Sequence, residues 1–144
     1  MKISTRGRYG IRLLIDLAEH ASEPHTALAL VAGRQNISIR YLEQVAVILR
    51  RSGFIRSVKG ASGGYALARP AHEIIIGEAL RVLEGDMLIV DPLLPGAKET
   101  RLQRCIRTTV YNRINDRIAQ IIDRETLASM TGTIDPDESY MYFI

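Results

Sequence analysis

Three successive segments in the first half of the chain carry apolar residues at helical spacing. Ser4, a favourable N-cap residue, precedes the first segment, which predicts a helix over residues 5–21 that Pro24 terminates. Thr26 is placed to cap a second, short helix. That helix is expected to break near Asn36, a residue that tolerates the left-handed conformation such a turn needs. A third helix follows at once, so the pattern predicts two short helices joined by a tight turn.

The third helix is predicted to begin after Ser38, again an N-cap residue, and to end at Gly53. One of its faces is apolar: Leu42, Val45, Ala46 and Leu49. Its other faces are polar: Arg40, Glu43, Gln44, Arg50 and Arg51. Such a pair is the helix–turn–helix unit, which places its second helix in a DNA major groove. Alone the pattern is a weak signal, because helix pairs with short turns are common.

A β-hairpin is predicted directly after this helix. Residues 54–58 and 65–68 are β-prone, and the glycine-rich stretch from Lys59 to Gly64 separates them. Glycine at a hairpin tip permits positive φ angles and close approach to a ligand, and a cation there suits phosphates or the minor groove. A DNA-binding wing is therefore predicted, with a plain surface turn as the alternative. A nucleotide P-loop fits poorly, because no Gly-Lys-Ser/Thr sequence opens a helix here.

The segment after Pro70 is predicted to return to the core. The isoleucines at 74–76 enter it, and a short helix over residues 78–83 closes at Gly85. Residues 86–98 contain two prolines and a glycine, which favour a loop or hinge. Such a loop is a natural place for an effector to act, although most loops are connectors.

Residues 99–123 contain neither proline nor glycine, and every fourth position is apolar: Leu102, Ile106, Val110, Ile114, Ile118 and Ile122. This spacing predicts one long amphipathic helix. Each step of four turns the stripe by about 40°, so the stripe is expected to wind around the helix. We therefore expect the helix to pack on its own domain at one part and on a second subunit at another, giving a two-fold dimer. A long helix lying on a monomeric core is the alternative.

Composition and charge fit a globular domain that meets a polyanion. Of the 144 residues, 47% are apolar and 24% charged, and no stretch approaches the roughly 18 apolar residues of a membrane span. Residues 1–70 hold 11 Lys and Arg against 4 Asp and Glu, a balance of +7; residues 71–144 hold 8 against 12, a balance of −4. The basic half is the candidate surface for DNA, and chance surface charge is the alternative.

The first twenty residues resemble a signal peptide only superficially. Arg12, Asp16 and Glu19 interrupt the apolar stretch, and no small-residue cleavage site follows. The single cysteine forms no internal disulfide, which agrees with a reducing cytoplasm. We therefore expect a cytoplasmic protein without a membrane partner.

Together these residues resemble a known family, the bacterial winged helix–turn–helix regulators of the Rrf type that include IscR, NsrR and CymR. The shared motifs are Met1-Lys2-Ile3-Ser4 with Gly7-Arg8-Tyr9, Ile37-Ser38, Tyr41-Leu42-Glu43-Gln44, Gly60 with Gly63-Gly64-Tyr65, Leu83-Glu84-Gly85 and Thr126-Leu127-Ala128. The Tyr-Leu-Glu-Gln sequence combined with the glycine wing is specific. The resemblance implies a mainly α fold with a small β-hairpin wing. It also implies a sequence-specific DNA-binding transcription regulator, a repressor, that acts as a homodimer on a palindromic operator.

The resemblance further implies roles for ten residues. Five would face the major groove: Ser38, Arg40, Tyr41, Glu43 and Gln44. Lys59 and Gly60 would lead the wing into the minor groove, where Lys supplies charge without the guanidinium fork of the Arg that relatives often have. Three would hold phosphates: Arg6, Arg8 and Tyr9. Arg40 suits a guanine and Glu43 a cytosine amino group.

Cluster-binding members of this family carry three regularly spaced cysteines between the hinge loop and the long helix. This chain keeps the last of them, Cys105, whereas the corresponding earlier positions hold Glu99 and Leu93. One thiolate cannot hold an iron–sulfur cluster, so we expect no such cofactor. The three histidines show no metal-ligand spacing, so no metal site is expected: His20, His25 and His72.

Cys105 supports two interpretations. The nearby Arg101, Arg104 and Arg107 would favour a thiolate and with it a redox switch, whereas the alternative is a small, half-buried residue beside the apolar stripe. No base or oxyanion motif accompanies the thiol, so we expect no enzyme. A winged helix that only contacts proteins is the alternative function, and a small-molecule or protein effector stays open.

The sequence thus predicts three parts. A winged helix–turn–helix domain occupies residues 1–85, and a hinge or effector loop occupies residues 86–98. A long dimerisation helix with a C-terminal tail occupies residues 99–144.

Overall fold

The computed structural model describes residues 1–132; the predicted C-terminal tail, from residue 133 onward, lies outside the described residues. The fold class is confirmed, since the chain is mainly helical with one two-stranded antiparallel sheet. The body consists of α1 (Thr5–Glu19), α2 (Leu28–Gln35), α3 (Ile39–Arg51), β1 (Ile55–Val58), β2 (Gly64–Leu67), a 3₁₀ turn (Ala71–Glu73), α4 (Ile76–Glu84) and α7 (Leu127–Met130). A further, continuous helix consists of α5 (Arg101–Ile106), a π-helical turn (Arg107–Tyr111) and α6 (Asn112–Ile122).

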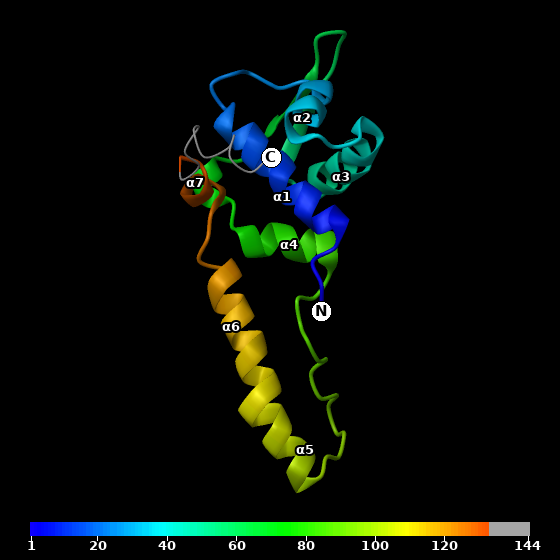
Figure 1. Cartoon of the computed structure of the whole chain (residues 1–144), viewed down its shortest axis with the longest axis vertical. Coiled ribbons are helices and arrows are strands. Elements are labelled where there is room, and N and C mark those ends of the chain that lie inside the picture. Colours follow the sequence, from blue (N-terminus) through cyan, green and yellow to red (C-terminus); the bar gives the residue numbers. More distant parts are fainter. Residues whose placement is uncertain (133–144) are drawn as a thin grey trace, which may run out of the picture.

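This further helix forms an arm that extends far from the body (Figure 1). The loop over residues 86–98 contains no helix or strand, as predicted, and runs beside the arm. Two hydrogen bonds hold it there: the Ile89 amide donates to Asn115 Oδ1 at 2.9 Å, and Asn115 Nδ2 donates to the Val90 carbonyl oxygen at 3.5 Å. Within residues 1–132, no helix has the length and apolar character needed to cross a membrane.

The core lies between α1, α3 and α4, whose apolar faces meet as their periodicity predicts. Its largest fully buried side chains include Leu13, Leu14, Leu42, Leu49, Ile55, Ile74, Leu83 and Leu127. Gly10 lets α4 approach α1 closely, because a Cβ there would lie 2.4 Å from a methyl carbon of Leu83. Ser4 caps α1 as predicted and also joins it to α4, since its hydroxyl donates to Glu84 Oε1 at 2.6 Å.

The segment before α2 differs from the prediction. Thr26 does not cap α2; the N-cap is Ala27, which makes no side-chain capping hydrogen bond. Thr26 is instead buried and exchanges two backbone hydrogen bonds of 2.8 Å with Tyr65 of β2. A β-branched residue suits this pairing, which attaches the segment to the hairpin. In addition, α1 ends at Glu19, well before Pro24.

The arm begins later than predicted and contains an unpredicted π turn. Thr100 caps it in a capping box: its hydroxyl accepts from the Gln103 amide at 3.1 Å, and Gln103 Oε1 accepts from the Thr100 amide at 2.8 Å. A π turn contains more residues than an α turn. Four residues therefore complete slightly more than one turn of an α-helix but slightly less than one turn of the π segment. The apolar stripe therefore winds around the arm less than the sequence analysis expected.

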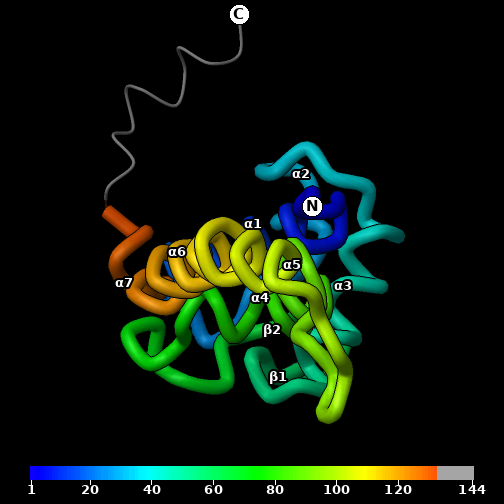
Figure 2. The backbone as a smooth tube through the Cα atoms, turned by 90° about the horizontal axis from the view of Figure 1, so that it is seen from below, coloured from blue at the N-terminus to red at the C-terminus, as the bar shows by residue number. Residues whose placement is uncertain are grey.

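The C-terminal end of the arm is anchored to the body. Ile118 and Ile122 pack against the core, and Arg81 of α4 donates two hydrogen bonds to Asp123 at 2.6 and 2.9 Å. Figure 2, which looks along the arm from its far end, shows α6 meeting the body beside α4 and α7. The expected contact of the long helix with its own domain is confirmed. The alternative, a helix lying on the core over its length, is wrong, because the arm projects away from the body.

Candidate nucleic-acid interface

The turn between α2 and α3 has the predicted geometry. Asn36 adopts the left-handed conformation (φ 51°, ψ 51°), and Ser38 caps α3 by accepting a hydrogen bond from the Tyr41 amide at 3.3 Å. The predicted apolar face of α3 is buried, so the opposite face lies in solvent. Four of the five residues predicted for the major groove are exposed: Ser38, Arg40, Glu43 and Gln44.

Tyr41, the fifth, lies half-buried on the flank of α3. Its ring meets the ring of Tyr9 edge-on, with the centroids 5.3 Å apart and the planes at 80°. The guanidinium of Arg12 lies 5.4 Å from the centroid of the Tyr9 ring. These ring contacts fix α3 against α1, a packing role that sequence analysis did not assign to either tyrosine.

Two further predicted phosphate contacts lie on the first turn of α1. Arg6 Nε donates to the Leu83 carbonyl oxygen at 2.7 Å, and Arg8 Nη2 donates to Thr5 Oγ1 at 3.2 Å. Both arginines are exposed. Since a guanidinium has five N–H donors, each retains donors for a phosphate.

The hairpin projects from the body beyond α2 (Figure 1). Lys59 and Gly60 are exposed in the turn between β1 and β2, as predicted. Gly60 has a φ of 121°, a conformation that favours glycine. A hydrogen bond between His25 Nε2 and the Ser62 carbonyl oxygen ties this turn to the segment before α2.

A buried carboxylate connects α1 to α2. Asp16 is 1% exposed and accepts hydrogen bonds from Arg34 Nε at 3.1 Å, Arg34 Nη2 at 2.6 Å and Gln35 Nε2 at 2.9 Å. Burial raises the pKa of Asp16, but the hydrogen bonds from Arg34 and Gln35 and the charges of Arg34 and His20 outweigh it, so the pKa lies below its ordinary value. Asp16 is therefore ionised at neutral pH and holds α2 on α1.

Three exposed arginines that sequence analysis left out of the site lie close to the predicted contacts in the chain. Arg50 and Arg51 end α3, and Arg56 lies on β1. Arg51 follows Arg40 by eleven residues, about three helical turns, so the two share one face of α3. This spacing is visible in the sequence and places Arg51 beside the candidate interface.

The arm exposes a row of aliphatic side chains. Their exposed fractions are 69% for Leu102, 37% for Ile106, 44% for Val110 and 41% for Ile114. A groove on α6 is lined by apolar and charged residues that include Val110, Ile114, Ile121, Arg113, Asp116 and Arg117. Exposed apolar residues on successive turns of one helix make this side of the arm a candidate surface for association.

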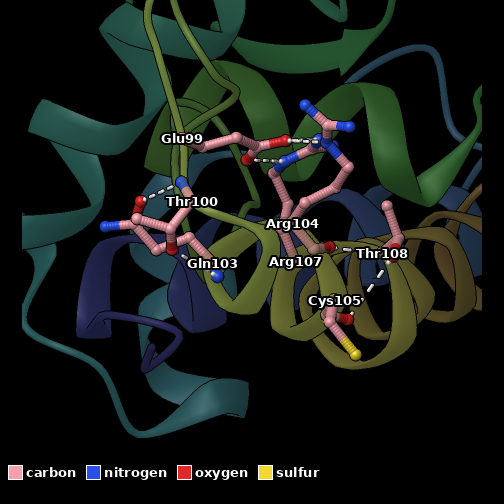
Figure 3. Close-up of polar contacts among 7 residues, drawn as sticks. All are labelled: Glu99, Thr100, Gln103, Arg104, Cys105, Arg107 and Thr108. Carbon is pink, nitrogen blue, oxygen red and sulfur yellow. Dashed lines mark hydrogen bonds and ion pairs between the residues drawn. The ribbon is translucent and has the colours of Figure 1, made fainter.

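Cys105 is exposed on α5, which corrects the interpretation of a half-buried residue. Its Sγ lies 3.9 Å from Thr109 Oγ1. Two of the neighbouring arginines are engaged elsewhere: Glu99 accepts hydrogen bonds from Arg107 at 2.5 and 2.9 Å and from Arg104 at 3.0 Å (Figure 3). The bonds from Arg107, followed by that from Arg104, lower the pKa of Glu99 to about 2. Figure 3 shows the thiol pointing away from this cluster.

The residues at the three cluster positions do not fit an iron–sulfur cluster. Leu93 offers no donor atom, the Glu99 carboxylate is held by two arginines, and Cys105 supplies a single thiolate. In the part of the chain that the structure describes, no group of three His, Cys, Asp or Glu side chains is placed to hold a metal ion.

A polar recognition helix followed by a projecting, glycine-tipped hairpin defines a winged helix–turn–helix protein. The chain belongs to the Rrf2 family, whose model, described as an iron-dependent transcriptional regulator, matches residues 3–133. It is therefore a transcriptional regulator, which confirms the resemblance predicted from the sequence.

Relatives and solved structures agree with this assignment. The HTH-type transcriptional regulator CymR of Bacillus subtilis (strain 168) is 37% identical over 145 residues, which cover all of both chains. The structure of CymR, described as the global cysteine regulator of B. subtilis, has a TM-score of 0.81 and 36% identity, and the match covers 94% of this chain and 99% of that one. The structure of T. potens IscR has a TM-score of 0.77 and 34% identity, covering 99% of this chain and 97% of that one.

Removal of the Asp16 carboxylate is expected to destabilise the protein. In Asp16→Ala, Arg34 and Gln35 lose a buried acceptor, and we expect the free energy of unfolding to fall by about 1.5–3 kcal/mol. Because the folded pKa is lowered, this contribution is present above the ordinary value of 3.8 and is lost as the pH falls through the folded pKa. Urea unfolding at neutral pH and below pH 3.8 measures it, with the exposed Glu23→Ala as control. Equal stability of wild type and Asp16→Ala at neutral pH contradicts the role given to this contact.

Proposed function

We propose that this regulator acts in the cytoplasm, binds DNA as a homodimer and represses transcription from a palindromic operator. One observation carries the proposal: the first turn of α3 and the wing turn are both exposed. Arg40 supplies a cation on the helix, and Lys59 supplies one on the wing. The positive balance of residues 1–70 supports the same surface. The names of the relatives, HTH-type regulators, are consistent with it.

In this proposal α3 enters the major groove and the wing enters the adjacent minor groove. Arg40 donates to a guanine, and Glu43 accepts from a cytosine amino group. The same groove receives Ser38, Tyr41 and Gln44. Lys59 and Gly60 lead the wing, and phosphates are held by Arg6, Arg8 and Tyr9. Arg51 extends the basic face of α3 toward the phosphates beyond it.

The arms supply the dimer contact. An antiparallel or crossed pair of arms covers the aliphatic row from Leu102 to Ile114, and the charged Arg113, Asp116 and Arg117 suit the rim of such an interface. A two-fold axis through the arms presents two reading heads, each consisting of α3 and the wing of one subunit, to one duplex. The half-sites then lie about one helical turn apart or more.

The 86–98 loop is the proposed site of regulation. In this proposal no iron–sulfur cluster takes part. The loop is held along the arm by Asn115, and Glu99 joins its end to Arg107. A small-molecule or protein effector that displaces the loop therefore acts directly on the arm that sets the spacing of the two heads.

Loss of the two cations is expected to weaken DNA binding. Arg40→Ala with Lys59→Ala removes a base contact and the wing charge, so we expect a loss of about 10- to 100-fold in gel-shift affinity for the upstream region of the protein's own gene. Wild-type affinity is expected to fall about a thousandfold between 50 and 200 mM salt. The control is Arg124→Ala, which removes an exposed cation that lies outside both the proposed interface and the 86–98 loop. Unchanged affinity of the Arg40 and Lys59 double variant contradicts the proposed interface, whereas a wild-type protein that retains no duplex even at low salt favours a protein-contact module.

A charge in the aliphatic row is expected to separate the subunits. Ile114→Glu places a carboxylate in the proposed apolar contact, so analytical ultracentrifugation at micromolar concentration is expected to show monomers where wild type shows dimers. Val82→Glu on α4 is the matched control, since Val82 is 39% and Ile114 41% exposed. A wild-type protein that is monomeric, or an Ile114→Glu variant that is still dimeric, counts against the arm contact.

DNA binding is expected to be independent of iron. Because one thiolate cannot retain a cluster, protein purified anaerobically with iron and sulfide is expected to bind the operator equally before and after chelation. Gel shifts combined with iron analysis test this. Stoichiometric iron, with binding lost on its removal, contradicts the expectation.

A further inference from the structure

Ile39 is an aliphatic residue that the structure leaves in solvent at the start of the recognition helix. It is the first residue of α3, between Ser38 and Arg40, and its exposed fraction is 45%. Ile37, two residues earlier, is 6% exposed and belongs to the core. Ile37 thus fills the position that this turn contributes to the core. Packing within the body does not explain why residue 39 is also an isoleucine.

The backbone that carries Ile39 is held in place, and general helix geometry sets the direction expected for its side chain. Ser38 caps the helix through its hydroxyl, and the next turn is fixed by the Tyr41 ring against Tyr9, so the backbone of Ile39 is constrained. A β-branched side chain in a helix has one strongly preferred rotamer. Helical side chains also lean toward the N-terminus of their helix, so Ile39 points past the end of α3. Glu43 follows four residues later on the same side.

This position meets a specific chemical group in DNA. Helix–turn–helix proteins contact base edges with the N-terminal residues of the recognition helix. The major-groove edges of the bases present hydrogen-bond donors and acceptors and one apolar group, the C5-methyl of thymine. We propose that Ile39 is a specificity residue that packs on the C5-methyl of a thymine at or next to the base pair that Glu43 reads. The inference rests on the proposed DNA-binding function and names one feature of its operator.

The test combines selection with removal of single methyl groups. Full-length protein selects duplexes from a random library, and each thymine of the selected site is then replaced by deoxyuridine, which lacks only the C5-methyl. At one thymine in a half-site, we expect this replacement to lower the affinity of the wild type about fourfold. A loss of this size corresponds to one methyl group that is no longer buried in the complex. Ile39→Ser is expected to bind the thymine and deoxyuridine duplexes equally. Ile39→Val, which keeps a branched aliphatic group, is expected to retain most of the preference.

Leu30→Ser is the matched control, because Leu30 is an aliphatic residue of α2 that is 58% exposed. It is expected to keep the fourfold preference, and circular dichroism checks that each variant folds. A wild-type protein indifferent to every deoxyuridine, or an Ile39→Ser variant with the wild-type preference, overturns the role of Ile39 while DNA binding stands. Failure of wild type to select any duplex overturns both the proposed function and this inference.

Discussion

The ion pair between the buried carboxylate of Asp16 and the solvent-facing Arg34 is the interaction on which the placement of α2 depends. Helix α2 has eight residues and one fully buried side chain, Val31, with Leu28 and Ala32 packed on the edge of the core, so its apolar contact is small. Asp16 adds three hydrogen bonds from the C-terminal end of α2, adjacent to the turn at Asn36, and Arg12 of α1 donates to Gln35 at the same end. Because that turn leads directly into the capped start of α3, this contact positions the end from which α3 begins, while the buried apolar face of α3 and the ring contact of Tyr9 and Tyr41 hold the helix itself.

The molecule separates the proposed recognition surface from the proposed assembly surface. The body displays polar side chains on α3 and a cation at the wing, whereas the arm displays aliphatic side chains and is anchored by Ile118, Ile122 and the pair of Arg81 with Asp123. The π turn reduces the winding of the aliphatic stripe, which brings its exposed members closer to one side of the arm. The loop between body and arm lies along the arm and is bound to it at Asn115 and Glu99. In the proposed dimer, a displacement of this loop therefore acts on the arm before it acts on the recognition helix.

Features set by neighbouring residues could be predicted from the sequence, and features set by distant partners could not. The buried face of α3, the left-handed Asn36 and the caps at Ser4 and Ser38 depend on residues within one or two turns. The pairing of Thr26 with Tyr65 requires the hairpin to lie beside a segment almost forty residues earlier. Local capping preference therefore predicted wrongly that Thr26 caps α2. The π turn has no local signature in the apolar repeat, and the exposure of Cys105 follows from an arm that leaves the body. The different burial of Ile37 and Ile39 depends on how the start of α3 meets the core, which the sequence pattern alone does not show.

We propose that two reading heads, spaced by paired arms, contact one duplex through α3 and the wing. Hydroxyl-radical footprinting of the wild-type protein on its selected operator tests this arrangement. This arrangement should give two symmetric sets of protected sugars, each spanning a major groove and the adjacent minor groove, with their centres about one helical turn apart or more. A single protected patch without two-fold symmetry, or protection confined to one groove, would contradict it.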